Sequence, residues 1–158
     1  MSKETLLPHR SFSTVLVVLV LLLGTLMAPV PYSSGEDSRA ERTLYVDDDG
    51  TETYTSIQSA VNAASAGDTI VVRDGEYVEN LVIGREITLR SDNGSAFTTI
   101  RAASSSNHCV QLLGDRTVLQ GFTITGAADG YNSANVYINK ASHCEILEND
   151  IRDSYHGA

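Results

Sequence analysis

The feature that most constrains the fold of this chain is a series of very short β-branched runs separated by clusters of Gly, Asn, Asp and Ser. The series comprises residues 69–72, 81–83, 87–89, 98–100, 110–112, 118–120, 122–124, 136–138, 145–147 and 150–152, and another short run, predicted to be a strand, precedes it at residues 43–46. Runs of this composition between turn residues are typical of β-strands. They hold only three or four residues, whereas the strands of sandwiches and hairpin sheets usually hold five or six. The sequence therefore favours a coil of strands over a hairpin sheet.

The runs repeat with a period close to 27 residues. Val110-Gln111-Leu112 returns as Val136-Tyr137-Ile138, 26 residues on, and residues 117–124 return as residues 144–151, 27 residues on. Each period holds three runs, so similar residues would stack at the ~4.8 Å strand spacing of a triangular solenoid. We expect an all-β, three-sheet solenoid of about three coils. Its inward residues are expected to be Leu81, Ile83, Val110, Leu112, Leu119, Ile124, Val136, Ile138, Ile146 and Ile151.

Residues 55–64 predict one amphipathic helix. Thr55-Ser56-Ile57-Gln58 fits a capping box, apolar residues follow at helical spacing, and Gly67 is a stop signal. The apolar stripe is narrow and rich in Ala. We therefore expect the helix to cover one end of the solenoid rather than to join a bundle.

Residues 1–35 have the layout of a secretory signal. Lys3 and Arg10 precede an unbroken apolar run at residues 15–23, and small residues at Ser33 and Gly35 fit cleavage before Glu36. An uncleaved anchor is the alternative, because residues 12–30 approach the ~20 residues that span a bilayer. We expect a charged linker at residues 36–42 and one domain at residues 43–158. The predicted location is secreted or at the cell surface, with membrane contact only through an uncleaved N-terminal segment.

The charge balance bears on the partners. Eleven Lys and Arg stand against 20 Asp and Glu, which gives a formal net charge of −9. A surface this acidic repels phosphate backbones, so we expect no nucleic-acid partner.

Three segments resemble a known superfamily. They are YTSIQSAVNAASAGDTIVVRDGEYVENLVI from Tyr54, TVLQGFTITGA from Thr117 and CEILENDIRDS from Cys144. They resemble right-handed parallel β-helix proteins of the pectin-lyase-like superfamily, in particular the repeat proteins related to NosD and to carbohydrate-binding and sugar-hydrolase domains. The resemblance covers residues 54–158 and implies a right-handed β-helix with an N-terminal capping helix, and an inward turn Asn at Asn149. This superfamily hosts lyases, hydrolases, binding modules and surface-layer proteins, so it implies the fold more than an activity.

The resemblance also indicates where catalytic groups would lie. Pectate lyases of this fold hold calcium with carboxylates on one outward sheet face. The corresponding outward positions in this chain are Val82, Gln111 and Tyr137, and none of them is a carboxylate. We interpret Glu145 and Asp150 as solvated surface acids rather than as the acid pair of a glycoside hydrolase. We therefore assign no catalytic residue in these coils.

Metal binding is not expected to be a main function. Asp47-Asp48-Asp49-Gly50 is predicted to be a turn with at most weak calcium affinity, because it lacks the alternating ligands and closing Glu of a calcium loop. The resemblance to NosD raises copper, which His and Cys bind. However, His108 and His156 fall two coils apart, roughly 10 Å at the strand spacing, and His143 falls on another corner. We expect no cofactor and no metal site.

The two cysteines are predicted to be unpaired. Strand alternation places Cys109 outward with Gln111, and Cys144 inward with Ile146 on a different sheet. A disulfide is permitted outside the cytosol, but these positions do not favour one.

Two kinds of surface residue are candidates for function. Gln111, Tyr131, Tyr137 and Tyr155 could bind and stack against the sugar rings of a polysaccharide, and the alternative is that these are ordinary half-buried side chains. Asn93-Gly94-Ser95 is an N-glycosylation sequon on a predicted loop.

These observations favour an exported β-helix repeat module with a structural or carbohydrate-binding role at the cell surface, whose partner is a polysaccharide or an envelope glycan. The alternatives are the non-catalytic N-terminal portion of a polysaccharide lyase or glycoside hydrolase and, ranked lower, a NosD-like copper-site maturation factor. The sequence stops at Ala158 as a new coil opens at His156, and no C-terminal cap follows. We interpret it as a C-terminally truncated fragment, and we expect its open end to aggregate or to stack end to end.

Overall fold

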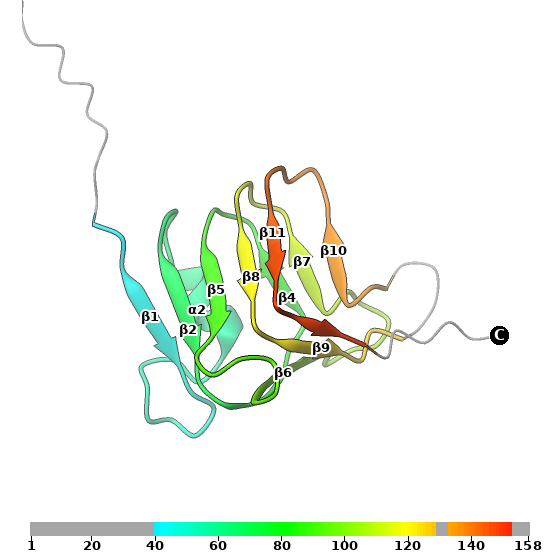
Figure 1. Ribbon diagram of the computed structural model, residues 1–158, viewed down its shortest axis with the longest axis horizontal. Coiled ribbons are helices and arrows are strands. Elements are labelled where there is room, and N and C mark those ends of the chain that lie inside the picture. Colours follow the sequence, from blue (N-terminus) through cyan, green and yellow to red (C-terminus); the bar gives the residue numbers. More distant parts are fainter. Residues whose placement is uncertain (1–39, 129–132, 153–158) are drawn as a thin grey trace, which may run out of the picture. The chain divides into compact units, whose positions relative to one another are not determined.

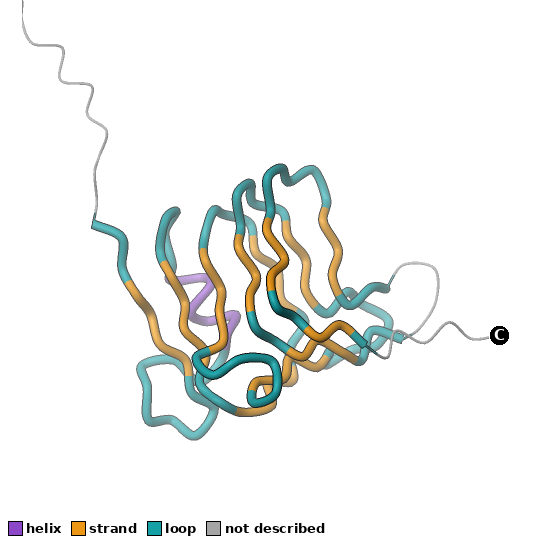
Figure 2. The backbone as a smooth tube through the Cα atoms, in the orientation of Figure 1, coloured by secondary structure: helices purple, strands orange, loops and turns teal. Residues whose placement is uncertain are grey.

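The computed structural model describes residues 40–128 and 133–152. These residues contain twelve short strands and one helix (Figures 1 and 2). In chain order they are β1 (Thr43–Val46), α2 (Ile57–Ala63), β2 (Thr69–Val72), β3 (Gly75–Val78), β4 (Leu81–Ile83), β5 (Thr88–Ser91), β6 (Thr98–Arg101), β7 (Val110–Leu112), β8 (Val118–Gln120), β9 (Thr123–Thr125), β10 (Val136–Ile138), β11 (Glu145–Leu147) and β12 (Asp150–Ile151). No helix among the described residues is long and apolar enough to cross a membrane.

The strands pair in parallel in three sheets. The first sheet has the order β1-β2-β5-β8-β11, the second sheet β12-β9-β6-β3, and the third sheet β10-β7-β4. From β2 onward, consecutive strands fall in the three sheets in rotation, so that each circuit adds one strand to each sheet (Figure 1). This arrangement confirms the predicted all-β parallel β-helix with three sheets and one helix.

The number of coils is about four rather than the predicted three. The sequence pattern missed β3, because its run Gly-Glu-Tyr-Val lacks the β-branched composition that marks the other strands. The short strand predicted at residues 43–46 is present as β1, which pairs with β2 and places Leu44 opposite Ile70. Both strands extend the solenoid toward its N-terminal end.

Left-handed residues recur at the corners between sheets. Gly121 has φ 78° and Glu148 has φ 54°, and they occupy the same corner between the first and second sheets in successive coils. Arg116 and His143 have φ 51° and 57° at the corner before β8 and β11. A left-handed residue turns the backbone sharply within one position, so successive strands keep their register around the corner.

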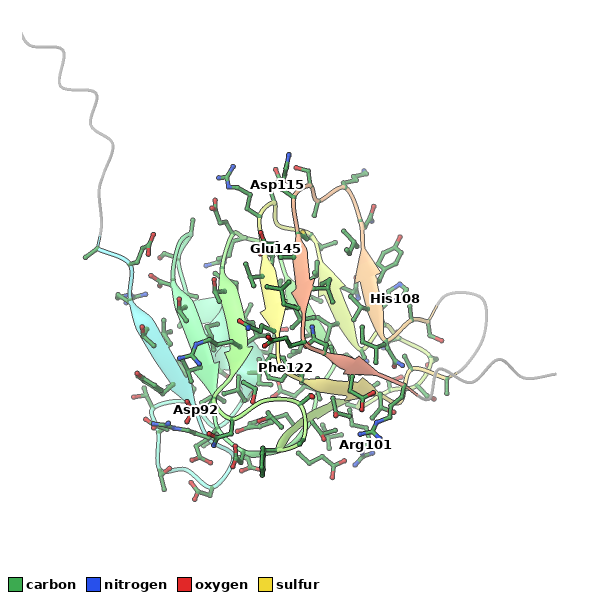
Figure 3. All side chains as sticks on the ribbon, viewed as in Figure 1. Asp92, Arg101, His108, Asp115, Phe122 and Glu145 are labelled. Atoms are coloured by element: carbon green, nitrogen blue, oxygen red, sulfur yellow. The ribbon has the colours of Figure 1, made fainter. Side chains whose placement is uncertain are left out.

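The core consists of inward side chains stacked in register. Ile70, Leu89 and Leu119 are successive partners of the first sheet and are fully buried. Burying a side chain of this size contributes about 1.5–3 kcal/mol, so each coil adds a layer of stabilisation to the one before. Phe122 lies in the same interior (Figure 3). It is buried at the corner and not within β9, so this strand begins one residue later than predicted.

The last described coil differs from the others in its burial. Val136, Ile138, Ile146 and Ile151 lie opposite buried residues of the preceding coil, as the predicted inward positions require. However, Ile138 and Ile151 are 45% and 46% exposed, and Val136 and Ile146 are only partly buried. No described strand pairs with the outer edges of β10, β11 and β12. The alternation in the sequence therefore predicts correctly which side chains point inward. Their burial requires a further coil packed against them.

Helix α2 covers the N-terminal end of the core and contacts β1, β2 and β4, as predicted. The predicted capping box is wrong by one residue, because Ser56 is the N-cap and its hydroxyl accepts from the backbone N–H of Ser59. The first backbone N–H groups are bound from outside the helix instead. Glu79 Oε1 accepts from Ile57 at 2.8 Å, and Oε2 accepts from Gln58 at 2.9 Å.

The side chain of Gln58 binds strand β4 and not, as the capping box predicted, the N-terminus of its own helix. Its Oε1 accepts from the backbone N–H of Val82 at 2.8 Å, and its Nε2 donates to the Val82 carbonyl at 3.2 Å. Val82 is the middle residue of β4, the edge strand of the third sheet. One amide side chain thus takes the place of a neighbouring strand and protects the edge.

Both described cysteines are free, which agrees with the prediction, but the outward orientation predicted for Cys109 is wrong. Cys109 is fully buried and its thiol donates to the Ile100 carbonyl. It stands immediately before β7, as Asn80 and Asn135 stand before β4 and β10, and strand alternation does not extend into this corner. The side chain turns inward there: Asn135 is also buried, and it accepts from Ala127 N–H.

Candidate functional site

The first candidate surface is the outward face of the third sheet. Val82, Gln111 and Tyr137 are successive partners across β4, β7 and β10. Val82 and Tyr137 are 41% and 37% exposed, and Gln111 is partly exposed. The predicted ladder of outward residues is therefore present, and none of its members has the carboxylate that a calcium-dependent lyase site needs.

Tyr137 is stacked against a neighbour from the previous coil. The rings of His108 and Tyr137 are parallel within 5° with centroids 4.0 Å apart. His108 lies beside β10 (Figure 3), and its Nδ1 is buried without a hydrogen-bond partner in the described part of the chain. This stacking holds the tyrosine ring in one orientation and joins two coils on this face.

The other residues of the predicted sugar platform cannot be placed. Tyr131, Tyr155 and His156 lie outside the described residues, as do residues 1–39. The structure therefore brings Gln111 and Tyr137 together and leaves the rest of the platform, the secretory segment and the His108–His156 comparison as predictions. His143 is exposed on the corner before β11.

The aspartate-rich segment after β1 is a turn, as predicted. Asp47 Oδ2 accepts from the Thr51 hydroxyl at 2.9 Å, and Asp49 Oδ1 accepts from the Thr51 N–H at 2.9 Å. Gly50 has φ 84° and donates to the Asp47 carbonyl. The carboxylates of Asp47 and Asp49 are thus used by the turn itself. Among the residues that the structure describes, no cluster of three or more His, Cys, Asp or Glu could hold a metal ion.

The two surface acids considered for hydrolysis belong to different sheets. Glu145 begins β11 in the first sheet, Asp150 begins β12 in the second, and both are exposed. Asp150 pairs with Arg152 at 3.2 Å. This arrangement fits the interpretation as solvated surface acids.

The second candidate surface is a groove that the sequence pattern did not indicate. It has a volume of about 300 Å³ and lies where the loop between β5 and β6 meets the outer face of β8. Arg90, Asp92, Asn93, Gly94, Gln120 and Glu148 are among its lining residues. Ligand sites begin at about this volume, so the groove is large enough for one small polar group.

The floor of the groove depends on a close approach of two backbones. A Cβ atom at Gly121 would lie 3.5 Å from Gly94 Cα and 3.5 Å from Ser91 Cβ, and Gly121 has φ 78°. The Ser91 hydroxyl accepts from the Gly94 N–H at 2.9 Å and bonds the Thr98 hydroxyl at 2.7 Å. The loop is therefore fixed onto the corner of the next coil.

The walls of the groove carry polar groups with bonding capacity to spare. Gln120 Nε2 donates to Glu148 Oε2 at 3.0 Å, which orients both side chains. Arg90 lies opposite Gln120 in register, and its Nη1 makes one long contact of 3.4 Å with the Ser91 carbonyl. Each of the other described arginines pairs with a carboxylate or, for Arg85, donates to the Ala64 carbonyl. Arg90 is the described arginine that faces a groove without a carboxylate partner.

The loop beside the groove is also held by the preceding coil. Asp92 pairs with Arg73 at 2.7 Å, and Asn93 Nδ2 donates to Asp74 Oδ1 at 3.0 Å. Arg73 also pairs with Glu52 at 2.8 Å and lies 5.0 Å from the centroid of the Tyr45 ring. The hydrogen bonds that Arg73 donates to Glu52 and Asp92 raise the pKa of its guanidinium above the ordinary value. Asp92 projects from this loop in Figure 3.

One buried carboxylate anchors the N-terminal end. Asp68 is 1% exposed and pairs with Arg42 at 3.0 Å. Burial alone would raise its pKa, but hydrogen bonds from the backbone of Ser65 and Arg42 and from the Arg42 guanidinium outweigh it and lower the pKa to about 2. Arg42, predicted to end the linker, is therefore bound to the folded core.

Part of the groove had a signal in the sequence. The period places Gln120 opposite Leu147, which is next to Glu148, so those two polar residues could have been matched from the repeat alone. The contribution of residues 92–97 could not, because this loop interrupts the period and nothing in its composition specifies where it folds.

Comparisons with known proteins agree with the fold. No family model matches the chain. A cell surface glycoprotein of Methanothermus fervidus is 32% identical over 106 residues, which is 66% of this chain, and the chain spans 16% of the length of that glycoprotein. The structure resembles pectin methylesterase from Aspergillus niger, with a TM-score of 0.57 and 19% identity over 73% of this chain and 46% of the esterase. The latter likeness shows the fold alone, a parallel β-helix.

Proposed function

We propose that this chain is an exported β-helix segment of a cell-surface protein, with a structural or carbohydrate-binding role. The observation that carries the proposal is the 106-residue match to a cell surface glycoprotein, which extends over 66% of the chain. The N-terminal segment predicted to direct export supports it. The chain spans 16% of that relative, so the activity and partners of the whole protein are part of the proposal.

The binding role would use the outward face of the third sheet. Tyr137 presents a ring held parallel to His108, and Gln111 presents an amide one strand away. Aromatic rings stack on the apolar faces of sugars, and amides bond their hydroxyl groups. Successive coils lie ~4.8 Å apart, so this face would follow an extended polysaccharide rather than enclose a single sugar.

Two measurements test the proposal. Antibody labelling of intact source cells should detect the chain at the surface, and labelling only after lysis would contradict the proposed location. The protein is then applied to a polysaccharide array with calcium. Retention of the protein indicates binding, and release of unsaturated sugars would contradict a non-enzymatic role.

A pair of variants locates the binding face. Tyr137→Ala should weaken retention by about fivefold, the change expected for one aromatic contact of ~1 kcal/mol. Tyr45→Ala is the control, because Tyr45 is 39% exposed on the first sheet. Equal retention by both variants would place the binding face elsewhere. Surface location without retention on any glycan would favour the structural role.

A further inference from the structure

Asn93-Gly94-Ser95 is the single N-x-Ser/Thr sequon in the chain. Asn93 lines the groove described above, together with Arg90, Gln120 and Glu148. The sequence motif and the groove are independent observations, since the lining residues Gln120 and Glu148 come from the following two coils. We infer that Asn93 is N-glycosylated and that the first sugar of the glycan lies in this groove.

The sequon is accessible in the folded chain. Asn93 is exposed on the loop between β5 and β6, and a Cβ atom at Gly94 would meet nothing within 4 Å. The space above the middle of the sequon is therefore open. The loop is nevertheless well fixed, because Asp92 and Asn93 are bound by Arg73 and Asp74.

The existing hydrogen bond of Asn93 is compatible with the modification. The Nδ2 atom would attack C1 of a lipid-linked glycosyl phosphate, the C1–O bond would break, and the phosphate would leave with its electron pair. Nδ2 loses one proton to the solvent and keeps the other. Nδ2 lies 3.0 Å from Asp74 Oδ1 and keeps one N–H with which it can donate to this carboxylate.

The groove suits a sugar by its chemistry. Gln120 and Glu148 are bonded to each other through one atom each, and no other hydrogen bond to Gln120 Oε1 or Glu148 Oε1 occurs in the described residues. These oxygens can accept from sugar hydroxyl or acetamido groups, and the Arg90 guanidinium can donate. The volume of about 300 Å³ fits one sugar residue rather than a longer segment.

The inference rests on the export that the proposed function requires, so the first experiment measures export and glycosylation separately. The full chain is translated with microsomal membranes: protection from protease reports translocation, and a glycan-dependent mobility shift reports use of the sequon. We expect one shift in the native chain and in Ser95→Thr, and none in Asn93→Gln or Ser95→Ala. Trypsin releases residues 91–101, and the mass of this peptide should place the glycan on Asn93.

The outcomes separate the two proposals. A chain that is protected but carries no glycan overturns the inference about Asn93. A chain that is not protected contradicts export, and hence the proposed function. In that case a cleavable secretion signal placed ahead of the full chain delivers it, and absence of the glycan then overturns the inference.

The second experiment tests the place of the sugar. Removal of the glycan by an amidase is timed on the folded glycoprotein. Gln120→Ala should accelerate removal about fivefold, as expected for the loss of one hydrogen bond of ~1 kcal/mol. Thr99→Ala is the control, because Thr99 is a partly exposed side chain of β6 on another sheet and belongs to neither candidate surface. Glu148→Ala gives a second variant of the same wall. Removal rates equal to the control in both groove variants would overturn the location in the groove.

Discussion

At the scale of single residues, strand alternation does not predict the direction of side chains at the corners of the coil. Alternation correctly placed Leu81 and Ile83 inward, because both lie within one strand. It failed at Cys109, one residue before a strand, where the backbone direction changes. The useful signal was that Asn80 and Asn135 also stand immediately before strands of the third sheet. This shared position indicates that the residue there points inward.

Asn149 shows that a corner can also be predicted from a resemblance. Its Oδ1 accepts from Phe122 N–H at 2.8 Å and its Nδ2 donates to the Leu119 carbonyl at 2.7 Å. The amide therefore binds the preceding coil, as expected for an inward turn Asn. Alternation would not have indicated this role, since Asn149 lies between two strands.

The burial of Cys109 predicts selective reactivity of the two thiols. Burial raises the pKa of Cys109 to about 11, so the thiolate that reacts with alkylating reagents is scarce as well as inaccessible. Cys144 is only partly buried. We expect iodoacetamide to label one thiol per folded chain and two per unfolded chain, as measured by mass. Cys144→Ser should abolish labelling of the folded chain, and rapid labelling that persists in this variant would contradict the assignment.

Asp68 predicts a loss of stability in acid. Its pKa is lowered to about 2 from an ordinary 3.8, so the stabilisation is complete above about pH 5 and is lost as the pH falls through about 2. A shift of this size corresponds to roughly 2 kcal/mol. Urea unfolding between pH 7 and pH 2 should show this loss. Asp68→Asn should be less stable at pH 7 and should show a shallower decline, whereas Glu145→Gln, an exposed acid on β11, serves as the control. An undiminished decline in Asp68→Asn would contradict the assignment.

At the scale of elements, the helix and the strands differ in how far the sequence specifies them. The bounds of β7, β8 and β10 follow from the repeat, because each is a β-branched run between turn residues. The end of α2 nearest its N-cap could not be derived in this way, since the group that binds its first N–H atoms is Glu79, more than twenty residues away. Local capping patterns do not contain such contacts.

Glu79 should therefore matter more than its neighbour Glu76. Glu79→Ala removes two charge-assisted bonds to the start of α2, and we expect it to lower the free energy of unfolding by about 2 kcal/mol. Glu76 pairs with Arg101 at the surface, where such pairs contribute about 0–1 kcal/mol. Chemical denaturation of both variants checks the difference. Equal losses would show that Glu79 does not stabilise the helix start.

At the scale of the molecule, a sequence repeat predicts how the coils stack better than it predicts where grooves form on their outer faces. The stacking of the core followed from the period, and so did the ladder from Val82 to Tyr137. The groove beside Asn93 did not, because it needs the loop between β5 and β6 to fold onto the corner of another coil. Function in a solenoid depends on such interruptions of the repeat, where sequence periodicity is least informative.

The partly uncovered last coil predicts self-association. Ile138 and Ile151 expose large apolar side chains beside edges of β10 and β12 that no described strand pairs with. We expect the 158-residue chain to associate with rising concentration, as measured by sedimentation. Ile138→Lys should weaken association at least tenfold, because it places a charge on this end. Val82→Lys is the control, since Val82 is similarly exposed on the outward face of β4. A chain that stays monomeric at high concentration would contradict the prediction.

The two ends of the solenoid differ, because helix α2 and Gln58 lie at the N-terminal end. A head-to-tail contact needs two complementary ends, and repetition of that contact produces an open filament. Here α2 covers the core at one end, and the Gln58 amide already occupies the edge of β4. Among the described strands, β1 and β3 are also edge strands of their sheets at this end, so the edge protection by Gln58 is confined to the third sheet. At that sheet, two C-terminal ends can pair with each other in an isologous contact that closes at two copies, whereas a head-to-tail contact would have to displace Gln58.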